Sequence, residues 1–384
     1  MRILAIESSC DETSAAILEK NGDEIIVLSN ITATSLQMHA ETGGIIPENA
    51  ARMQVKYILP VIIEALCASE DKRQKTKDNS WEMAREILIH QIDAIATTYG
   101  PGLIGSLLVG VETVKTLAYV FNKPLIPVNH LLAHIYANFI QTSNSQLLTS
   151  SFPFIGLIVS GGHTDLLFFR DHGEYEWLGG TRDDAAGEAF DKIGRILGLP
   201  YPAGPEIERR ANLVTQTDIR FKSPIIGEDN FDFSFSGLKT EVGRFTESKG
   251  VTSGGGPPSS TRNLSETNGE DIGRGRSDDR TPLINQICYA TQKAIIDVLV
   301  KKTLKAAEKY NCKNILVGGG VSANLTLRKE FELQTINYKL QTDIFFPEKI
   351  YSTDNGAMIG AYALLNETSI TWCDVNANPE LYFA

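Results

Sequence analysis

The chain contains a strand–loop–strand unit twice, once in each half, and this repeat is the strongest constraint on its fold. The first unit spans residues 2–18 and has the polar loop 8–13 at its centre. The second spans residues 154–169 and turns at the Ser/Gly-rich loop 160–164. Each unit opens with a largely apolar run, which is typical of a strand buried on both faces. The repeat therefore predicts two related halves.

Helices and strands are expected to alternate outside these units. The pattern predicts helices at 48–67 and 111–120, a strand at 92–98, and a strand at 314–317 that runs into a glycine turn. A strand pair joined by a Ser/Gly/Asp loop, once per half, resembles the phosphate-gripping element of the actin-like ATPase superfamily. The resemblance implies an α/β protein of the actin-like ATPase (ASKHA) fold, with two ribonuclease-H-like lobes around a central cleft.

The chain has 384 residues, which is sufficient for two such lobes. We predict an N-terminal lobe at 1–128, completed by a C-terminal helix at about 355–366, and a C-terminal lobe at 129–354. Within the second lobe, residues 248–281 contain no aromatic side chain and few large aliphatic ones. This segment buries too little surface to offset its ordering entropy, so we expect a disordered insertion. Its arginines could contact RNA phosphates, but its acidic residues balance them and favour a passive loop.

His130 and His134 stand four residues apart in a run with helical spacing of its apolar residues. The spacing places both imidazoles on the flank of an amphipathic helix, where they could share one metal ion. For these two residues alone, a solvent-facing pair without a metal is the commoner interpretation. A zinc-peptidase helix carries a glutamate directly after its first histidine, and here Leu131 occupies that place. Peptidase activity is therefore disfavoured.

Asp354 precedes a run of small residues that permit close packing of a helix. It could cap that helix, or it could complete a His-His-Asp set on a divalent ion with open positions for substrate oxygens. Asp183 and Asp184 also stand where a helix begins, and we expect them to satisfy its N-terminus. Asp191 lies beyond that first turn and could accept hydrogen bonds from ribose hydroxyls.

Two glycine-rich turns follow apolar strands, at Ser160-Gly161-Gly162 and at 318–320. Backbone NH groups without side chains in the way allow close approach of a phosphate or an acyl-phosphate. Glycines after a strand also serve tight turns without any ligand. The occurrence of two such turns in the same context favours a nucleotide cleft.

Composition limits the choice of partners and compartment. The formal net charge of −11 argues against nonspecific affinity for polyanions, although RNA binding through a local surface stays open. No uninterrupted apolar stretch reaches the length of a membrane span and no signal-peptide architecture precedes the first strand, so we expect a cytoplasmic protein with no membrane. The five cysteines are scattered without a Cys-x-x-Cys pair and fit a reducing compartment.

Together these segments resemble the tRNA N6-adenosine threonylcarbamoyltransferase family, the bacterial TsaD proteins and their archaeal and eukaryotic relatives. The blocks that carry the resemblance follow the family's order along the chain: 7–13, 43–48, 100–103, His130 with His134, 159–164, 184–191, 233–239, 318–324 and 353–355. The insertion, the charged connection after Cys67 and the C-terminal end fall outside it.

The resemblance implies transfer of a threonylcarbamoyl group from threonylcarbamoyl-AMP to N6 of the adenosine immediately 3′ to the anticodon in tRNA, forming t6A and releasing AMP. It implies one divalent metal ion, Fe²⁺ with Zn²⁺ as the alternative, on His130, His134 and Asp354. It also implies TsaB-like and TsaE-like partner proteins. The positions that match the family's adenylate-binding residues are Ile158, Val159, Ser160, Gly161, Gly162, Asp191, Gly204 and Asn324.

Asp11 and Glu12 lie in the loop of the first unit, which would face the same cleft, so we expect them to orient the attacking amine or the substrate. The chain departs from the family at Gln54, where many members have histidine, and this position is therefore not expected to be a ligand. Two other classes of function remain open: a catalytically silent scaffold subunit of the modification complex, and an actin-like kinase, which would not need the three metal-ligand residues together.

Overall fold

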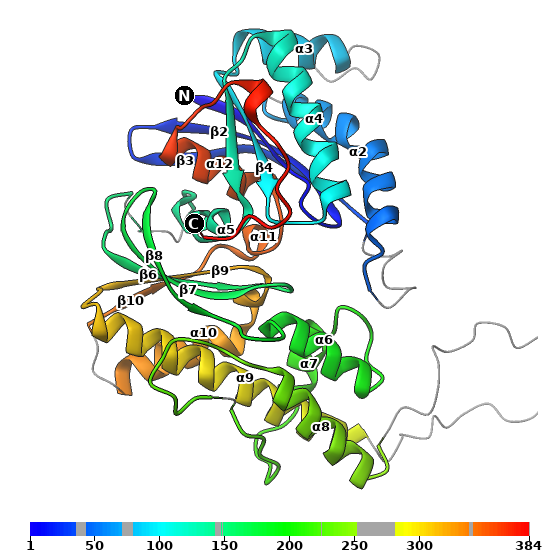
Figure 1. Ribbon diagram of the computed structural model, residues 1–384, viewed down its shortest axis with the longest axis vertical. Helices are drawn as coiled ribbons and strands as arrows, with labels where there is room; N and C mark the ends of the chain where they lie inside the picture. Colours follow the sequence, from blue (N-terminus) through cyan, green and yellow to red (C-terminus); the bar gives the residue numbers. More distant parts are fainter. Residues whose placement is uncertain are drawn as a thin grey trace, which may run out of the picture.

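The computed structural model contains two five-stranded sheets stacked along its long axis, with helices on their outer sides and between them (Figure 1). It describes residues 1–35, 44–70, 80–142, 147, 149–223, 225–251, 281–337 and 341–383. Most of the expected insertion, residues 252–280, lies outside the described residues. Of its predicted margins, Ser248 ends one helix and Thr281 begins another.

The first sheet has the order β3-β2-β1-β4-β5. Its strands are β1 (Arg2–Glu7), β2 (Glu12–Asn21), β3 (Glu24–Thr34), β4 (Ala94–Gly100) and β5 (Leu125–Asn129). Strand β2 runs antiparallel to β1 and β3, whereas β4 runs parallel to β1 and β5. Alternate residues of β1 enter two different cores, Ile3 and Ala5 on one face and Leu4 and Ile6 on the other. Burial on both faces explains why this strand is an apolar run.

The second sheet repeats this pattern of directions in the order β10-β9-β6-β7-β8. Its strands are β6 (Phe154–Val159), β7 (Thr164–Asp171), β8 (Glu174–Gly180), β9 (Asn314–Gly318) and β10 (Asp343–Phe345). Strand β7 is antiparallel to β6 and β8, and β9 is parallel to β6 and β10. The duplication predicted from the two strand–loop–strand units is therefore present in the fold.

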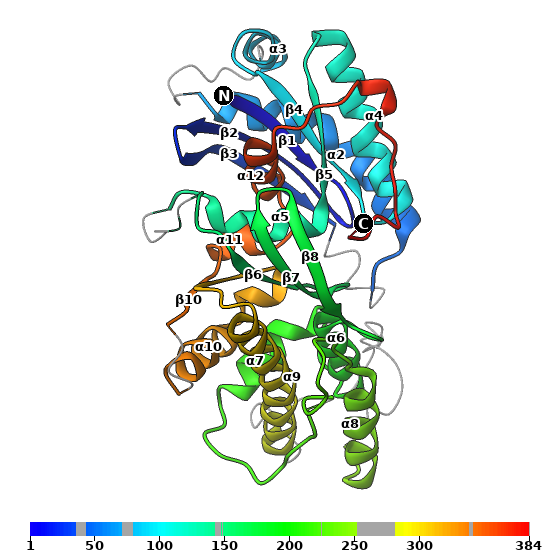
Figure 2. The same cartoon turned by 60° about the vertical axis from the view of Figure 1, so that its left-hand side comes forward.

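Helices cover the outer side of each sheet (Figures 1 and 2). Those of the first sheet are α2 (Pro47–Ala68), α3 (Ser80–His90) and α4 (Ile104–Phe121). Those of the second are α6 (Ala186–Ile196), α7 (Ala203–Ala211), α8 (Ser236–Ser248), α9 (Thr281–Lys309) and α10 (Leu325–Asn337). Short 3₁₀ turns follow at η3 (Ala137–Phe139), η4 (Gly320–Ala323) and η5 (Trp372–Asp374).

Helix α4 is, by length and composition alone, long and apolar enough to cross a membrane, with a mean hydropathy of 1.4 over 18 residues. Glu112 and Lys115 interrupt this helix, so it is not a continuous apolar stretch. Its residues Leu107, Val111 and Val114 are fully buried, and the helix packs against β4 and α2. Core packing therefore explains the apolar residues on the buried face of α4, whereas Leu108, Tyr119 and Val120 are exposed.

Three helices lie between the two sheets: α5 (His130–Tyr136), α11 (Lys349–Ser352) and α12 (Gly356–Asn366) (Figure 2). All seven residues of α5 are buried. The prediction of an amphipathic helix with its histidines on an exposed flank was therefore wrong, because α5 contacts β5 and α12 on one side and β6 and β9 on the other. A helix enclosed by two sheets has no solvent face.

The C-terminal segment after η5 returns to the level between the sheets (Figure 1). The backbone NH of Asn378 donates to the carbonyl of Tyr99 at the end of β4, over 2.7 Å. Further along, the rings of Tyr382 and His163 stand 6.0 Å apart, and His163 belongs to the β6–β7 loop. This segment therefore contacts the edge of both halves.

Candidate metal and adenylate site

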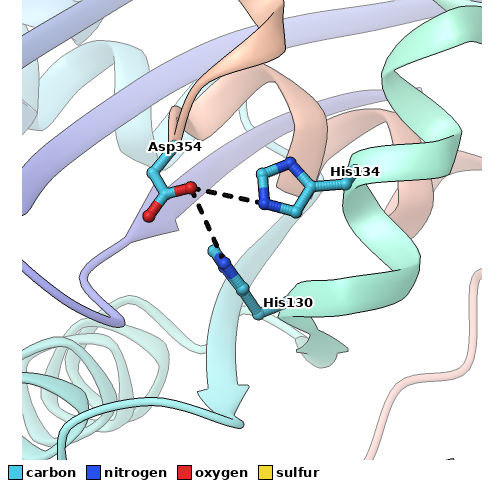
Figure 3. Close-up of side chains that lie close together, drawn as sticks. All are labelled: His130, His134 and Asp354. Carbon is cyan, nitrogen blue, oxygen red and sulfur yellow. Dashed lines mark ion pairs between the residues drawn. The ribbon is translucent and has the colours of Figure 1, made fainter. Parts of the chain in front are cut away.

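His130, His134 and Asp354 converge between the two sheets (Figure 3). The histidines come from successive turns of α5, and Asp354 comes from the connection between α11 and α12. Asp354 Oδ1 lies 3.3 Å from His134 Nε2 and 3.7 Å from His130 Nε2. One ligand atom of each residue lies within 4.8 Å of the other two. The fold thus brings together the three residues that the sequence singled out as metal ligands.

The spacing of these atoms fits a shared cation. Two donors bound to one ion at about 2.1 Å stand about 3.0 to 3.4 Å apart in octahedral or tetrahedral geometry. The two separations from Asp354 Oδ1 are close to that range. His134 is only 1% exposed, its Nδ1 has no hydrogen-bond partner among the described residues, and its Nε2 faces the Asp354 carboxylate in an ion pair. A metal ion between Nε2 and Asp354 Oδ1 would bind both atoms. This His/His/Asp cluster could hold a metal.

The start of α5 is fixed by Asn129, the last residue of β5. Its side-chain oxygen accepts hydrogen bonds from the backbone NH groups of Leu131 and Leu132, as an N-cap does. On the opposite side, a Cβ added at Gly318 would lie 2.5 Å from the carbonyl carbon of His134. Gly318 is therefore required for the close approach of β9 to the helix backbone, and it sets the position of the second histidine.

Asp354 is not the cap of the helix that follows it. Asn355 is the N-cap of α12 and accepts a hydrogen bond from the backbone NH of Met358. A Cβ at Gly356 would lie 2.7 Å from the backbone nitrogen of Ala16, so this glycine permits close packing of α12 on β2. With the capping role taken by Asn355, the Asp354 carboxylate is free to face the histidines.

Glu7, the last residue of β1, is a part of the site to which the sequence analysis gave no role. It is completely buried and accepts hydrogen bonds from the backbone NH of Ser9 and from Thr98 Oγ1, and its Oε2 lies 3.2 Å from His130 Nδ1. A carboxylate at the end of a buried apolar strand was the signal that could have identified it, since an unpaired charge is rarely buried.

Charges around the cluster shift its titration. Burial lowers the pKa of His130, but the carboxylates of Glu7 and Asp354 raise it more, to about 9. Burial alone would raise the pKa of Asp354, whereas the two histidines hold it below its usual range. A metal ion therefore competes with a proton for His130, and its binding would strengthen as the pH rises.

Of the two predicted catalytic residues, Asp11 lies in the loop between β1 and β2 and Glu12 begins β2; this loop contacts the cluster through Ser9 and His130. Burial and the neighbouring charge of Asp11 raise the pKa of Glu12 to about 9, and Glu12 Oε1 accepts a hydrogen bond from Thr34. Gln54 is buried and its side-chain NH₂ donates to the carbonyls of Cys10 and Glu12, both over 3.0 Å. Gln54 therefore holds this loop in place through its amide nitrogen.

The β6–β7 loop is a tight turn whose glycines face open space. Ser160 and His163 are joined by a hydrogen bond from the Ser160 NH to the His163 carbonyl over 2.9 Å. A Cβ at Gly161, Gly162 or Gly204 would meet no atom within 4 Å. The described fold itself does not require glycine at these three positions, which leaves room for a ligand to approach the backbone closely.

The other predicted adenylate contacts have partners within the protein. The side chains of Ile158 and Val159 are buried in the cores, so only their backbone could face a ligand. Asp191 Oδ1 accepts a hydrogen bond from the backbone NH of Ala203 and so caps α7. The Asn324 side chain accepts from Leu327 NH and donates to Gln292.

The sequence suggested that Asp183 and Asp184 accept hydrogen bonds from the backbone NH groups at the start of α6, but this prediction was wrong. The Asp183 carboxylate accepts hydrogen bonds from the backbone NH groups of Phe235 and Ser236, and so stabilises the start of α8. Asp184 forms an ion pair with Lys192 over 2.6 Å. Ala185 is the N-cap of α6 and has no side-chain oxygen. The prediction failed because the tertiary structure places the start of α8 beside this loop, although α8 is distant in the sequence.

Fold and site together define an α/β protein of duplicated design with a His/His/Asp cluster between its halves. A family model described as "TsaD: tRNA N6-adenosine threonylcarbamoyltransferase" matches residues 26–361. A protein of Moorella thermoacetica named tRNA N6-adenosine threonylcarbamoyltransferase is 41% identical over 381 residues, 99% of this chain and 96% of its own length. One of Lacticaseibacillus casei with the same name is 41% identical over 99% of this chain and 97% of its own. The chain belongs to the tRNA N6-adenosine threonylcarbamoyltransferase family.

A likeness to a solved structure supports the fold. Full-length HypF in its phosphate- and nucleotide-bound form aligns with a TM-score of 0.55 at 12% identity, over 95% of this chain and 55% of the HypF chain. At this identity the likeness concerns the fold alone. It agrees with the two similar sheets, and the predicted actin-like ASKHA fold is confirmed.

Proposed function

We propose that this protein transfers the threonylcarbamoyl group from threonylcarbamoyl-AMP to N6 of the adenosine at position 37 of tRNAs that read ANN codons, forming t6A and releasing AMP. The observation that carries the proposal is the convergence of His130, His134 and Asp354 in a chain of this family. An actin-like kinase would not need this cluster. A silent scaffold subunit would tolerate its loss.

We propose Fe²⁺ as the ion of the cluster, with Zn²⁺ as the alternative. Two histidines and one carboxylate form the ligand set typical of non-haem iron sites, and such a set leaves coordination positions open. A divalent ion bound there would act as a Lewis acid toward oxygens of the mixed anhydride and would stabilise charge as AMP leaves. His130, His134 and Asp354 would hold it.

The adenylate is proposed to bind along the β6–β7 loop and the adjoining helix starts. Gly161, Gly162 and Gly204 offer backbone with open space in front of it, which suits phosphate oxygens. Asp191 has one carboxylate oxygen engaged with Ala203, and we assign the other to the ribose hydroxyls. The backbone that leads into the same turn would also contribute, at Ile158, Val159 and Ser160. Asn324 is proposed to line the adenylate site from the start of α10.

The proposed reaction forms one bond and breaks one. The N6 nitrogen attacks the carbamoyl carbonyl carbon, a C–N bond forms, the C–O bond to phosphate breaks with its electron pair leaving on AMP, and the proton that N6 loses passes to solvent. Asp11 and Glu12 are proposed to orient the attacking amine. Because burial and Asp11 raise the pKa of Glu12 to about 9, Glu12 would be protonated near neutral pH and could donate a hydrogen bond.

We further propose that the protein works in the cytoplasm with tRNA and with TsaB-like and TsaE-like partners. The two lobes are proposed to be residues 1–128 with the helix at 355–366, and residues 129–354. The packing of α12 on β1 and β2 supports the assignment of that helix to the first lobe.

The test is incubation of the protein with threonylcarbamoyl-AMP and unmodified tRNA, with and without the partner proteins, followed by mass spectrometry of the nucleosides. His134→Ala is expected to lower t6A formation more than about 100-fold while the far-UV circular dichroism stays that of wild type. The matched control is His90→Gln, an exposed histidine of α3 that should leave the rate unchanged. Wild-type t6A formation in His134→Ala would contradict the metal role, and no product from wild type under any condition would favour a scaffold.

A further inference from the structure

Glu7 occupies the side of His130 that faces away from Asp354. The two nitrogens of the ring have different neighbours, Glu7 Oε2 and Ser9 Oγ each 3.2 Å from Nδ1, and Asp354 Oδ1 3.7 Å from Nε2. Glu7 is 0% exposed. The His130 imidazole thus has a buried carboxylate at one ring nitrogen and a second carboxylate at the other.

We propose that Glu7 is a positioning residue that holds His130 in one tautomer, with the proton on Nδ1 and a bare Nε2 directed at the metal position. The inference rests on the proposed metal site. It assigns to Glu7 the task of orienting a ligand and increasing its basicity, which a carboxylate behind a metal-bound histidine performs in other proteins.

The hydrogen bonds around Glu7 identify the donor. An ionised carboxylate only accepts, so each neighbouring group must supply a hydrogen. The backbone NH of Ser9 and the hydroxyl of Thr98 do so, and His130 Nδ1 is the third group within reach. With its proton on Nδ1, the ring has a lone pair on Nε2, which a metal ion needs. The opposite tautomer would direct a hydrogen at Asp354 and block the ion.

His134 provides the internal contrast. Its Nδ1 has no hydrogen-bond partner among the described residues and its Nε2 faces Asp354 Oδ1 at 3.3 Å, so no described group holds the proton on Nδ1 of that ring. Of the two histidines, His130 is therefore the preorganised ligand, and its orientation depends on a residue of β1. The metal site thus includes the first strand of the chain, 123 positions before His130.

The proposal is tested on the full-length protein, stripped of metal and titrated with Zn²⁺ alone against a chromophoric chelator. Glu7→Gln keeps the shape of the side chain and removes its charge, and it is expected to weaken Zn²⁺ binding about 10- to 100-fold. Asp165→Asn is the matched control: Asp165 is also buried and accepts a hydrogen bond from a ring NH, that of Trp177, but lies in β7. The control should bind Zn²⁺ within about twofold of wild type.

A spectroscopic signature separates positioning from folding. In ¹⁵N-histidine-labelled, Zn²⁺-loaded wild type, His130 should show a slowly exchanging, downfield proton on Nδ1, and that signal should move upfield or vanish in Glu7→Gln. If Glu7→Gln fails to fold, Thr98→Val, which keeps the charge and removes one hydrogen bond to Glu7, should weaken Zn²⁺ binding by about three- to tenfold.

Two results would overturn the inference: Zn²⁺ affinity of a folded Glu7→Gln or Thr98→Val equal to that of wild type, or an Nε2-protonated His130 in the loaded protein. Neither measurement involves tRNA. A protein that binds Zn²⁺ as expected but forms no t6A would contradict the proposed function and leave this inference standing.

Discussion

Replacement of Gly318 by alanine tests whether packing of the second sheet sets the position of the metal ligands. The new Cβ would stand 2.5 Å from the carbonyl carbon of His134 and 3.0 Å from the backbone nitrogen of Ile135. Contacts under 3.0 Å essentially never occur, so α5 or β9 must move by at least about 0.5 Å in a closely packed interior. Overpacking of this kind costs about 1–3 kcal/mol in free energy of unfolding.

The same displacement should reach the site. Because both histidines are on α5, we expect Gly318→Ala to weaken Zn²⁺ binding about tenfold, in addition to its loss of stability. Chemical unfolding and chelator competition measure the two effects. The control is Gly243→Ala in α8, where the nearest atom is Ile196 Cδ1 at 3.8 Å and alanine should stabilise the helix by about 0.5–1 kcal/mol. Stability and Zn²⁺ affinity of Gly318→Ala both equal to wild type would refute the reasoning.

Two more perturbations act away from the cluster. Burial raises the pKa of Asp165 from 3.8 to about 6, so the folded protein favours the protonated form. Asp165→Asn should therefore raise the free energy of unfolding above pH 6 by up to about 3 kcal/mol. This gain in stability should decline between pH 6 and pH 3.8 and be absent at lower pH. Urea titrations across that pH range measure it. Deletion of residues 378–384 removes the hydrogen bond from Asn378 to Tyr99, and hydrogen exchange should accelerate at 99–102 while the rest of β4 keeps its protection. Unchanged exchange there would show that the segment does not hold this turn.

The fold was predictable where a periodic or apolar pattern is local. The runs that became β1 and β6 are buried on both faces, so hydrophobicity alone identifies them, and the repeated loop after each run indicates the duplication. The environment of α5 was not predictable in this way. Its apolar arc suggested one buried face, but β9 and β6 approach its other side from a part of the chain that the helix sequence does not encode.

The site residues differ in the same way: some are indicated by the local sequence, and others are brought together only by the fold. The pair His130 and His134 is visible from spacing within one helix, whereas Asp354 could equally have been a helix cap until the family resemblance favoured it as a ligand. Glu7 was not assigned a role because its partners, Thr98 and His130, come from other elements and only the fold brings them together. Asp183 shows the opposite error: a residue that fits a local capping rule for α6 serves the distant helix α8.

The proposed metal ligands and the proposed adenylate loop come from different parts of the fold. Asp354 immediately precedes α12, which packs on β1 and β2. Glu7 ends β1 itself, and both histidines are on α5, the helix that follows β5. The glycine loop 160–162 belongs to the second sheet. Because α5 also contacts β6 and β9, and β9 approaches the backbone of His134 at Gly318, the position of His134 depends on the packing of the second sheet as well.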